Sequence, residues 1–119
     1  MVAANCQRVL PMSHRTLIVA RMDPDDAPEV AKIFTGSDAG ELPRRLGVTR
    51  RTLFEFHGLY FHLVESEGDV AQRLPAVRED PLFVDVNTRL ESYVTPYDPQ
   101  TWRGPRDAMA RPFYSWTAD

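Results

Sequence analysis

The sequence has a single cysteine, Cys6, among its 119 residues. One cysteine allows no internal disulfide and no cysteine-based metal site, which suits a reducing cytoplasm. The three histidines, His14, His57 and His62, lack the close spacing of a zinc or iron site. The chain also lacks a glycine-rich phosphate loop and a Gly-x-Ser-x-Gly segment. We therefore expect no metal and no cofactor, so that any catalysis would depend on acid–base groups and on shape.

Long apolar runs and clusters of basic residues are scarce as well. No apolar run approaches the roughly 18–20 residues that span a membrane, and the first residues do not resemble a secretory signal. The net charge is −3, and the basic residues are scattered apart from the pairs Arg44-Arg45 and Arg50-Arg51. These features argue against a membrane span and against nucleic acid as the main partner, and they favour a cytoplasmic location.

The length and composition are those of one globular domain, with 43% hydrophobic and 26% charged residues. We interpret residues 1–12 as a ragged N-terminal extension and residues 13–119 as the domain. A small domain buries only one modest core, so a sizeable ligand cavity would compete with that core for apolar side chains. Dimerisation is one way to obtain both.

The first half of the domain predicts a strand followed by a helix. Residues 14–22 form an apolar run typical of a strand. Asp23 and Pro24 then suit the cap and first position of a helix, whose apolar residues recur at helical spacing from Ala27 to Phe34. We expect this helix to end near Gly36 and residues 37–47 to form a loop.

The second half begins with a predicted hairpin of two strands within residues 47–66, joined by a turn at His57-Gly58. A helical pattern containing Val70, Leu74 and Val77 follows, and Pro75 should kink or split it.

The segment from Asp80-Pro81 onward predicts another helix, with Leu82, Val86, Leu90 and Tyr93 on one face. Residues 95–112 should be mostly loop, and residues 112–116 can form a last strand. The predicted order is βαββαβ, an α+β ferredoxin-like fold with a four-stranded antiparallel sheet and helices on one face. A second subunit is the natural cover for the other face.

His62 and Arg51 are the first candidates for chemistry. Imidazole exchanges protons near neutral pH, but a mid-strand histidine between Phe61 and Leu63 can equally be a buried structural residue. A fixed guanidinium could polarise an enolate oxygen, or Arg51 could be a surface residue that pairs with a glutamate. The alternation of a strand does not decide whether Arg51 and His62 share a face, because a bulge would change the answer.

Asp38 is a further candidate, in the expected loop after the first helix. It could accept a proton or orient a histidine, although turn chemistry explains an aspartate there equally well. His57 is more simply a solvated turn residue.

Four segments resemble a known family: HRTLIVARMDPDDAPEVAKIF, ELPRRLGVTRRTLFEFHGLYFHLVE, DPLFVDVNTRLESYVTPY and FYSWTA. Together they are similar to the aromatic polyketide cyclases of the tetracenomycin F2 cyclase type, over roughly residues 13–118. Any one of these segments alone would be a weak signal, but their conjunction is specific.

The resemblance implies a cofactor-free homodimer, a dimeric α/β barrel with a pocket between the sheet and the helices. It implies ring closure of a partly cyclised poly-β-ketone by intramolecular aldol condensation and dehydration, in a bacterial type II polyketide pathway. Arg51, His62 and Asp38 fall on polar pocket positions of the family. Some relatives have a histidine directly before that aspartate, where this chain has Ser37. The candidates to stack on an aromatic substrate are Phe54, Phe56, Tyr60, Phe61 and Trp102, most of which could equally belong to the core.

Two other functions remain open at this point. A cofactor-free monooxygenase acting on anthrone-type polyketides uses the same fold and would require oxygen. The protein could also bind a nascent polyketide without catalysis and make transient contact with components of the synthase.

Overall fold

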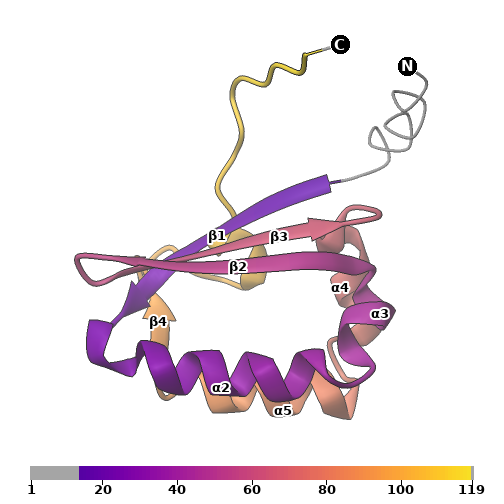
Figure 1. Cartoon of the computed structure of the whole chain (residues 1–119). Helices are drawn as coiled ribbons and strands as arrows, with labels where there is room; N and C mark the ends of the chain where they lie inside the picture. Colours follow the sequence, from indigo (N-terminus) through magenta and orange to yellow (C-terminus); the bar gives the residue numbers. More distant parts are fainter. Residues whose placement is uncertain (1–13, 119) are drawn as a thin grey trace.

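The computed structural model describes residues 14–118, so the predicted extension at residues 1–12 lies outside the described residues. Four strands form one antiparallel sheet in the order β2-β3-β1-β4. The long helices α2 and α5 lie side by side on one face of it, and no helix among the described residues covers the other face (Figure 1). The predicted ferredoxin-like architecture is confirmed. Between residues 14 and 118, no helix is both long enough and apolar enough to cross a membrane.

The first strand and helix begin as predicted, but the helix ends later. Strand β1 spans His14–Met22, and Asp23 caps a short 3-10 turn, Pro24–Asp26, with its carboxylate accepting from the Asp25 N–H at 2.9 Å. Helix α2 then runs over Ala27–Asp38. The expected stop at Gly36 was wrong, because one glycine inside a helix costs only about 1 kcal/mol and the helix continues through it.

The expected loop at residues 37–47 was also wrong in part. Asp38 is the last residue of α2, and a short helix α3 covers Leu42–Leu46. Pro43 is tolerated in the first turn of α3, where its missing N–H has no partner to lose. Gly47 ends α3 in the left-handed conformation with a φ of 75°, a common helix terminus.

The central hairpin agrees with its prediction. Strands β2 (Val48–Phe56) and β3 (Leu59–Ser66) are joined by His57 and Gly58, whose φ values of 50° and 84° are those of a tight hairpin turn. Burial alternates strictly along β3, with its even-numbered residues inside. The register shifts between Val48 and Arg50, and beyond this irregularity Leu53 pairs with His62. These pairings place the odd-numbered residues of β2 and the even-numbered residues of β3 on the face toward the helices.

The second helical region forms two helices, α4 (Val70–Val77) and α5 (Pro81–Leu90), capped by Asp69 and Asp80. Pro75 lies within α4, and the separation comes after Val77 rather than at the proline. Because proline has no N–H, the carbonyl of Ala71 is free to accept another donor. The Nη2 of Arg106 donates to it at 3.2 Å, so a C-terminal residue is tied to this helix.

The position of the fourth strand was predicted wrongly. Strand β4 is Val94–Pro96, which pairs with the end of β1 immediately after α5. A short helix η3 (Pro105–Ala108) follows, and Met109 forms an isolated bridge with Ile18 of β1. The chain then leaves the sheet without forming a strand at residues 112–116, and Phe113 is 94% exposed (Figure 1). On β1, β4 pairs only with residues 20–22 and Met109 bridges Ile18, and residues 112–116 form no strand pairing with the rest of the described chain.

Two apolar clusters hold the layers together. One joins the sheet to α2 through Ala20, Met22, Val30, Phe34 and Tyr60, and the other joins α3 to α4 through Leu42, Leu46 and Val77. Arg45 of α3 is also paired with the Asp80 carboxylate at the start of α5. These contacts fix the end of α2, where Asp38 lies, relative to strands β2 and β3.

Candidate functional site

Four polar side chains from three elements meet between the sheet and α2. Arg51 comes from β2, His62 and Tyr60 from β3, and Asp38 from the end of α2. Arg51 donates to both carboxylate oxygens of Asp38, from Nη2 at 2.7 Å and from Nε at 3.0 Å. Its Nη1 lies 2.9 Å from His62 Nε2, and His62 Nδ1 lies 3.3 Å from the Tyr60 hydroxyl. The structure thus joins the three predicted polar residues in one network.

The hairpin register explains why Arg51 and His62 meet. Arg51 pairs with Val64, and Leu53 pairs with His62, so Arg51 and His62 are diagonal neighbours on one face. Long side chains reach each other across such a diagonal. The sequence left this arrangement undecided, because the irregularity near Arg50 could have reversed the faces.

His62 is buried and neutral. It is only 7% exposed, and burial together with the positive charge of Arg51 lowers its pKa from 6.5 to about 3. An arginine can only donate, so the Nε2 of His62 must accept from Arg51. Both ring nitrogens are therefore engaged, and the ring holds Arg51 in place.

Arg51 is held on its remaining side by an aromatic ring that the sequence analysis did not single out for this role. Its guanidinium carbon lies 4.7 Å from the centroid of the Phe34 ring, and Phe34 also meets His62 edge to face at 5.1 Å. The first is a cation–π contact that stabilises the guanidinium. The second is an edge-to-face contact between two aromatic rings. Spacing offered a signal, because Phe34 and Asp38 are four residues apart and hence neighbours on one helix face.

The network runs from the core to the surface. Tyr60 is 3% exposed, and burial raises the pKa of its hydroxyl. The side chain of Arg51 is 13% exposed, whereas that of Asp38 is 40% exposed. Asp38 is therefore the member that solvent or a ligand reaches most readily.

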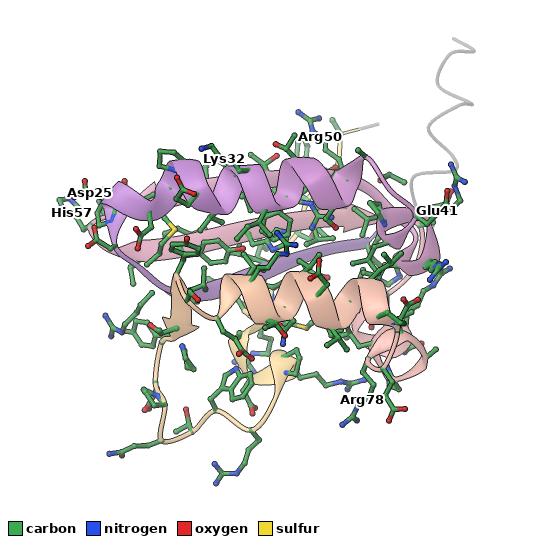
Figure 2. All side chains as sticks on the ribbon, turned by 90° about the horizontal axis from the view of Figure 1, so that it is seen from below. Asp25, Lys32, Glu41, Arg50, His57 and Arg78 are labelled. Atoms are coloured by element: carbon green, nitrogen blue, oxygen red, sulfur yellow. The ribbon has the colours of Figure 1, made fainter. Side chains whose placement is uncertain are left out.

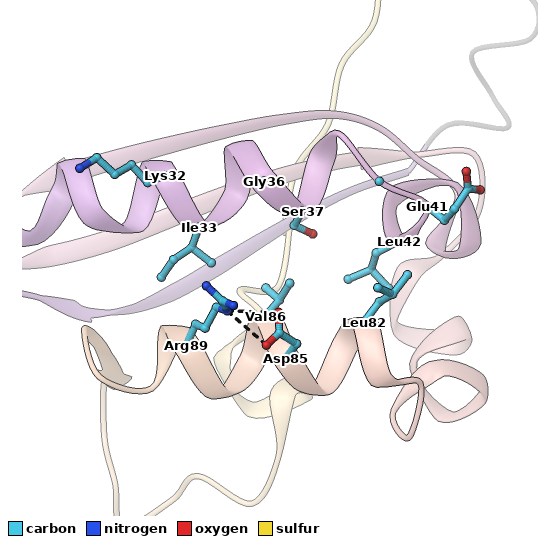
Figure 3. Close-up of a pocket in the computed structure, with 11 residues that line it drawn as sticks. Lys32, Ile33, Gly36, Ser37, Glu41, Leu42, Leu82, Asp85, Val86 and Arg89 are labelled. Carbon is cyan, nitrogen blue, oxygen red and sulfur yellow. Dashed lines mark hydrogen bonds and ion pairs between the residues drawn. The ribbon is translucent and has the colours of Figure 1, made fainter.

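Two hollows lie near the end of α2. One, of about 280 Å³, is a groove between α2 and α5, where Ile33, Leu82 and Val86 lie beside the ion pair of Asp85 and Arg89 (Figure 3). Ser37 points from α2 toward this groove (Figure 3). The other, also of about 280 Å³, lies between α3 and the start of β2 and is lined in part by Asp38. Neither hollow is lined by Arg51 or His62, so Asp38 is the point at which the polar network meets an open space.

The predicted aromatic residues do not gather at this site. Phe54 and Phe61 form a cross-strand pair on the face opposite His62, and Phe56 lies on the same outer face. Phe54 and Phe56 are 50% and 61% exposed, and Trp102, in the segment after β4, is 41% exposed. Tyr60 alone lies on the face of His62, and it is buried. The contact of the three phenylalanines and Trp102 with a substrate remains a prediction.

His57 lies away from the network, as the sequence indicated. It occupies the hairpin turn and stacks edge to face on Phe56 at 4.2 Å. Figure 2 shows His57 beside Asp25 at one end of the molecule, whereas Glu41, three residues beyond Asp38, lies at the other end. Within residues 14–118, no group of three or more His, Cys, Asp or Glu side chains could hold a metal ion.

Comparison with known proteins decides the family. The sequence profile described as polyketide synthesis cyclase matches residues 14–117. Tetracenomycin F2 cyclase of Streptomyces glaucescens is 50% identical, over 90% of this chain and 97% of that protein. Its solved structure, described as that of a type-II polyketide cyclase, gives a TM-score of 0.83 over 89% of this chain and 99% of that one. The chain belongs to the polyketide synthesis cyclase family.

Two further relatives agree with this assignment. An uncharacterised protein of Streptomyces coelicolor is 58% identical, over 87% of this chain and 94% of that protein. Polyketide synthase CurG of Streptomyces cyaneus is 49% identical, over 89% of this chain and 99% of that protein. The family resemblance predicted from the sequence is confirmed. In this polyketide synthesis cyclase, Arg51 is the centre of the polar network.

Proposed function

We propose that the protein closes a ring of a partly cyclised poly-β-ketone by intramolecular aldol condensation and dehydration, in a bacterial type II polyketide pathway. The observation that carries this proposal is the fixed guanidinium of Arg51. Asp38, His62 and Phe34 all contact it, so it cannot move freely. A cation held in place in this way suits an oxygen that becomes negative during the reaction.

The proposed reaction begins with loss of a proton from a carbon between two carbonyls. The resulting enolate carbon attacks a ketone carbon of the same chain, and the ketone oxygen becomes an alkoxide and takes up a proton. Loss of water then gives the unsaturated ring. In our proposal Arg51 stabilises the enolate oxygen, Asp38 takes up the carbon-bound proton, and His62 holds Arg51.

Shape supplies most of the catalysis in this proposal. A poly-β-ketone is reactive by itself, and the protein has to bring one carbon to one carbonyl. Positioning can contribute up to about 7–11 kcal/mol in favourable intramolecular reactions. A single positioned acid or base adds typically about 10²–10⁴-fold. The second hollow is where the substrate would approach, because Asp38 lines it.

We also propose a cytoplasmic homodimer that contacts the polyketide synthase transiently. The uncovered sheet face carries the exposed rings of Phe54 and Phe56. The segment beyond η3 carries Phe113, Tyr114 and Trp116, which are 94%, 79% and 74% exposed. Apolar surface of this kind favours association, and a second copy offers a matching face. The outer phenylalanines would then serve the interface, and Trp102 remains a candidate for substrate contact.

The test is an assay with a partly cyclised aromatic poly-β-ketone, with the products identified by mass spectrometry and NMR. Arg51→Gln should lower the rate of correct ring closure by about 10²-fold, the usual effect of losing one oxyanion-stabilising group. Arg50→Gln is the matched control, because Arg50 lies on the other face and forms an ion pair with Glu65 at 3.7 Å. Its rate should be unchanged.

Turnover that needs oxygen, measured by comparison under nitrogen, would indicate a monooxygenase instead. Turnover unaffected by removing both Arg51 and His62 would refute the role of Arg51, and a rate no higher than that without protein would indicate a binding role.

A further inference from the structure

Tyr60 is a buried tyrosine whose hydroxyl has a defined partner. The side chain is 3% exposed, and its oxygen lies 3.3 Å from His62 Nδ1. Burial leaves no room for a substrate to stack on this ring in the described structure. Buried polar groups in folded proteins nearly always have a hydrogen-bond partner.

The contact with Arg51 determines what the Tyr60 hydroxyl does. A guanidinium offers only donors, so His62 Nε2, at 2.9 Å from Arg51, must present its lone pair. A neutral imidazole with a free Nε2 lone pair carries its hydrogen on Nδ1. That N–H points at the oxygen of Tyr60, which therefore accepts it.

We propose that Tyr60 is a positioning residue whose hydroxyl accepts the Nδ1–H of His62 and so leaves the Nε2 lone pair to hold Arg51. This inference rests on the proposed function and deepens it, because it extends the site by one residue that does not touch the substrate. Tyr60 and His62 are two residues apart on β3, so their side chains share a face. The chain of contacts is Tyr60 to His62 to Arg51 to Asp38.

Removal of the hydroxyl weakens this arrangement in both possible forms of the ring. With Tyr60→Phe, the Nδ1–H tautomer keeps a buried N–H without an acceptor, which carries a desolvation cost. The other tautomer points an N–H at the guanidinium, and the contact with Arg51 is lost. Either way Arg51 is held less firmly, and turnover should fall about tenfold, the effect of losing one ordinary hydrogen bond.

The test uses the full-length protein labelled with ¹⁵N at histidine, observed by NMR between pH 5 and 8. In the wild type, the Nδ1 of His62 should give a pyrrole-type shift and Nε2 a pyridine-type shift, with no titration. In Tyr60→Phe the Nδ1 resonance should shift, through loss of its acceptor or through a change of tautomer, and kcat should fall while KM stays nearly constant. Tyr93→Phe is the matched control, since Tyr93 packs against the same core cluster. It should change neither the spectrum nor the turnover.

Three outcomes would overturn the proposal. These are a wild-type His62 with its hydrogen on Nε2, a charged His62 at neutral pH, and a Tyr60→Phe spectrum identical to that of the wild type. The wild-type spectrum needs no variant, so the proposal stays testable if Tyr60→Phe fails to fold. The spectrum is also independent of turnover. A wild-type protein without cyclase activity but with the expected tautomer would reject the proposed function and leave the hydrogen-bond assignment standing.

Discussion

The burial of His62 predicts a loss of stability in mildly acidic solution. In the unfolded chain, an ordinary histidine has a pKa near 6.5, whereas in the folded protein burial and Arg51 lower the pKa of His62 to about 3. Between these values the unfolded chain binds one more proton than the folded protein. The free energy of unfolding therefore falls as the pH drops through this window and recovers above pH 6.5.

The magnitude follows from the unfolded chain alone. At pH 5 a histidine of pKa 6.5 is almost fully protonated, and a folded-state pKa of about 3 leaves His62 almost fully neutral. Lowering the pH from 7 to 5 should therefore cost about 2 kcal/mol of stability through this one residue. This value hardly depends on the folded pKa, provided that it lies well below 5.

Urea unfolding at pH 7 and pH 5, followed by circular dichroism at one protein concentration, measures the effect. His62→Gln should remove about 2 kcal/mol of the pH dependence, because glutamine can accept from Arg51 but does not titrate. His57→Asn is the control, since asparagine tolerates the positive φ of 50° at this exposed turn and should leave the pH dependence unchanged. The contribution of Asp80, whose pKa is lowered by hydrogen bonds to the Leu82 N–H and Arg45, is lost only at more acidic pH. Equal pH dependence in the wild type and His62→Gln would refute a buried, neutral His62.

Two further predictions concern the backbone and the open face. Gly47→Ala should destabilise the protein by at least about 1–2 kcal/mol, because φ is 75° there and a Cβ would lie 2.8 Å from Arg73 Nη1. Gly36→Ala, in open space within α2, should instead raise the free energy of unfolding by about 0.5–1 kcal/mol. Thermal unfolding that ranks the two variants the other way would contradict this prediction. Phe56→Glu on the outer face should shift sedimentation toward the monomer without loss of the helical circular dichroism signal. The control Glu55→Gln should leave sedimentation unchanged. A wild-type protein that is monomeric at every concentration would rule out the dimer.

The parts of the fold that could be predicted are those governed by local rules. Asp23-Pro24 and Asp80-Pro81 both mark helix starts, and His57-Gly58 marks the hairpin turn, because each pair fixes its own backbone conformation. The predicted helix end at Gly36 was wrong because a local signal was overruled by packing. One glycine lowers helix stability only slightly, and packing of Phe34 against the sheet outweighs it.

The fourth strand could not be placed, because pairing depends on a partner distant in sequence. Residues 112–116 have strand-like composition, yet the segments that pair with β1 on this side are Val94–Pro96 and Met109. The arrangement of the site also depends on contacts between residues that are distant in sequence. Arg51, His62 and Asp38 were identified as candidates, but their contact depends on the register of β2 against β3 and on how far α2 extends. The aromatic residues were chosen by type, and strand alternation then placed Phe54, Phe56 and Phe61 on the other face.

The geometry of Arg51 favours a fixed electrostatic role over proton transfer by His62. A general base needs a free lone pair, but Nε2 of His62 already accepts from Arg51 and Nδ1 faces Tyr60. Protonation of His62 would place two donors 2.9 Å apart and expel the guanidinium. The network therefore keeps one positive charge in one place, paired with Asp38 at the exposed end. A ring closure that mainly requires orientation gains from such a charge, because it stabilises the enolate without moving during the reaction.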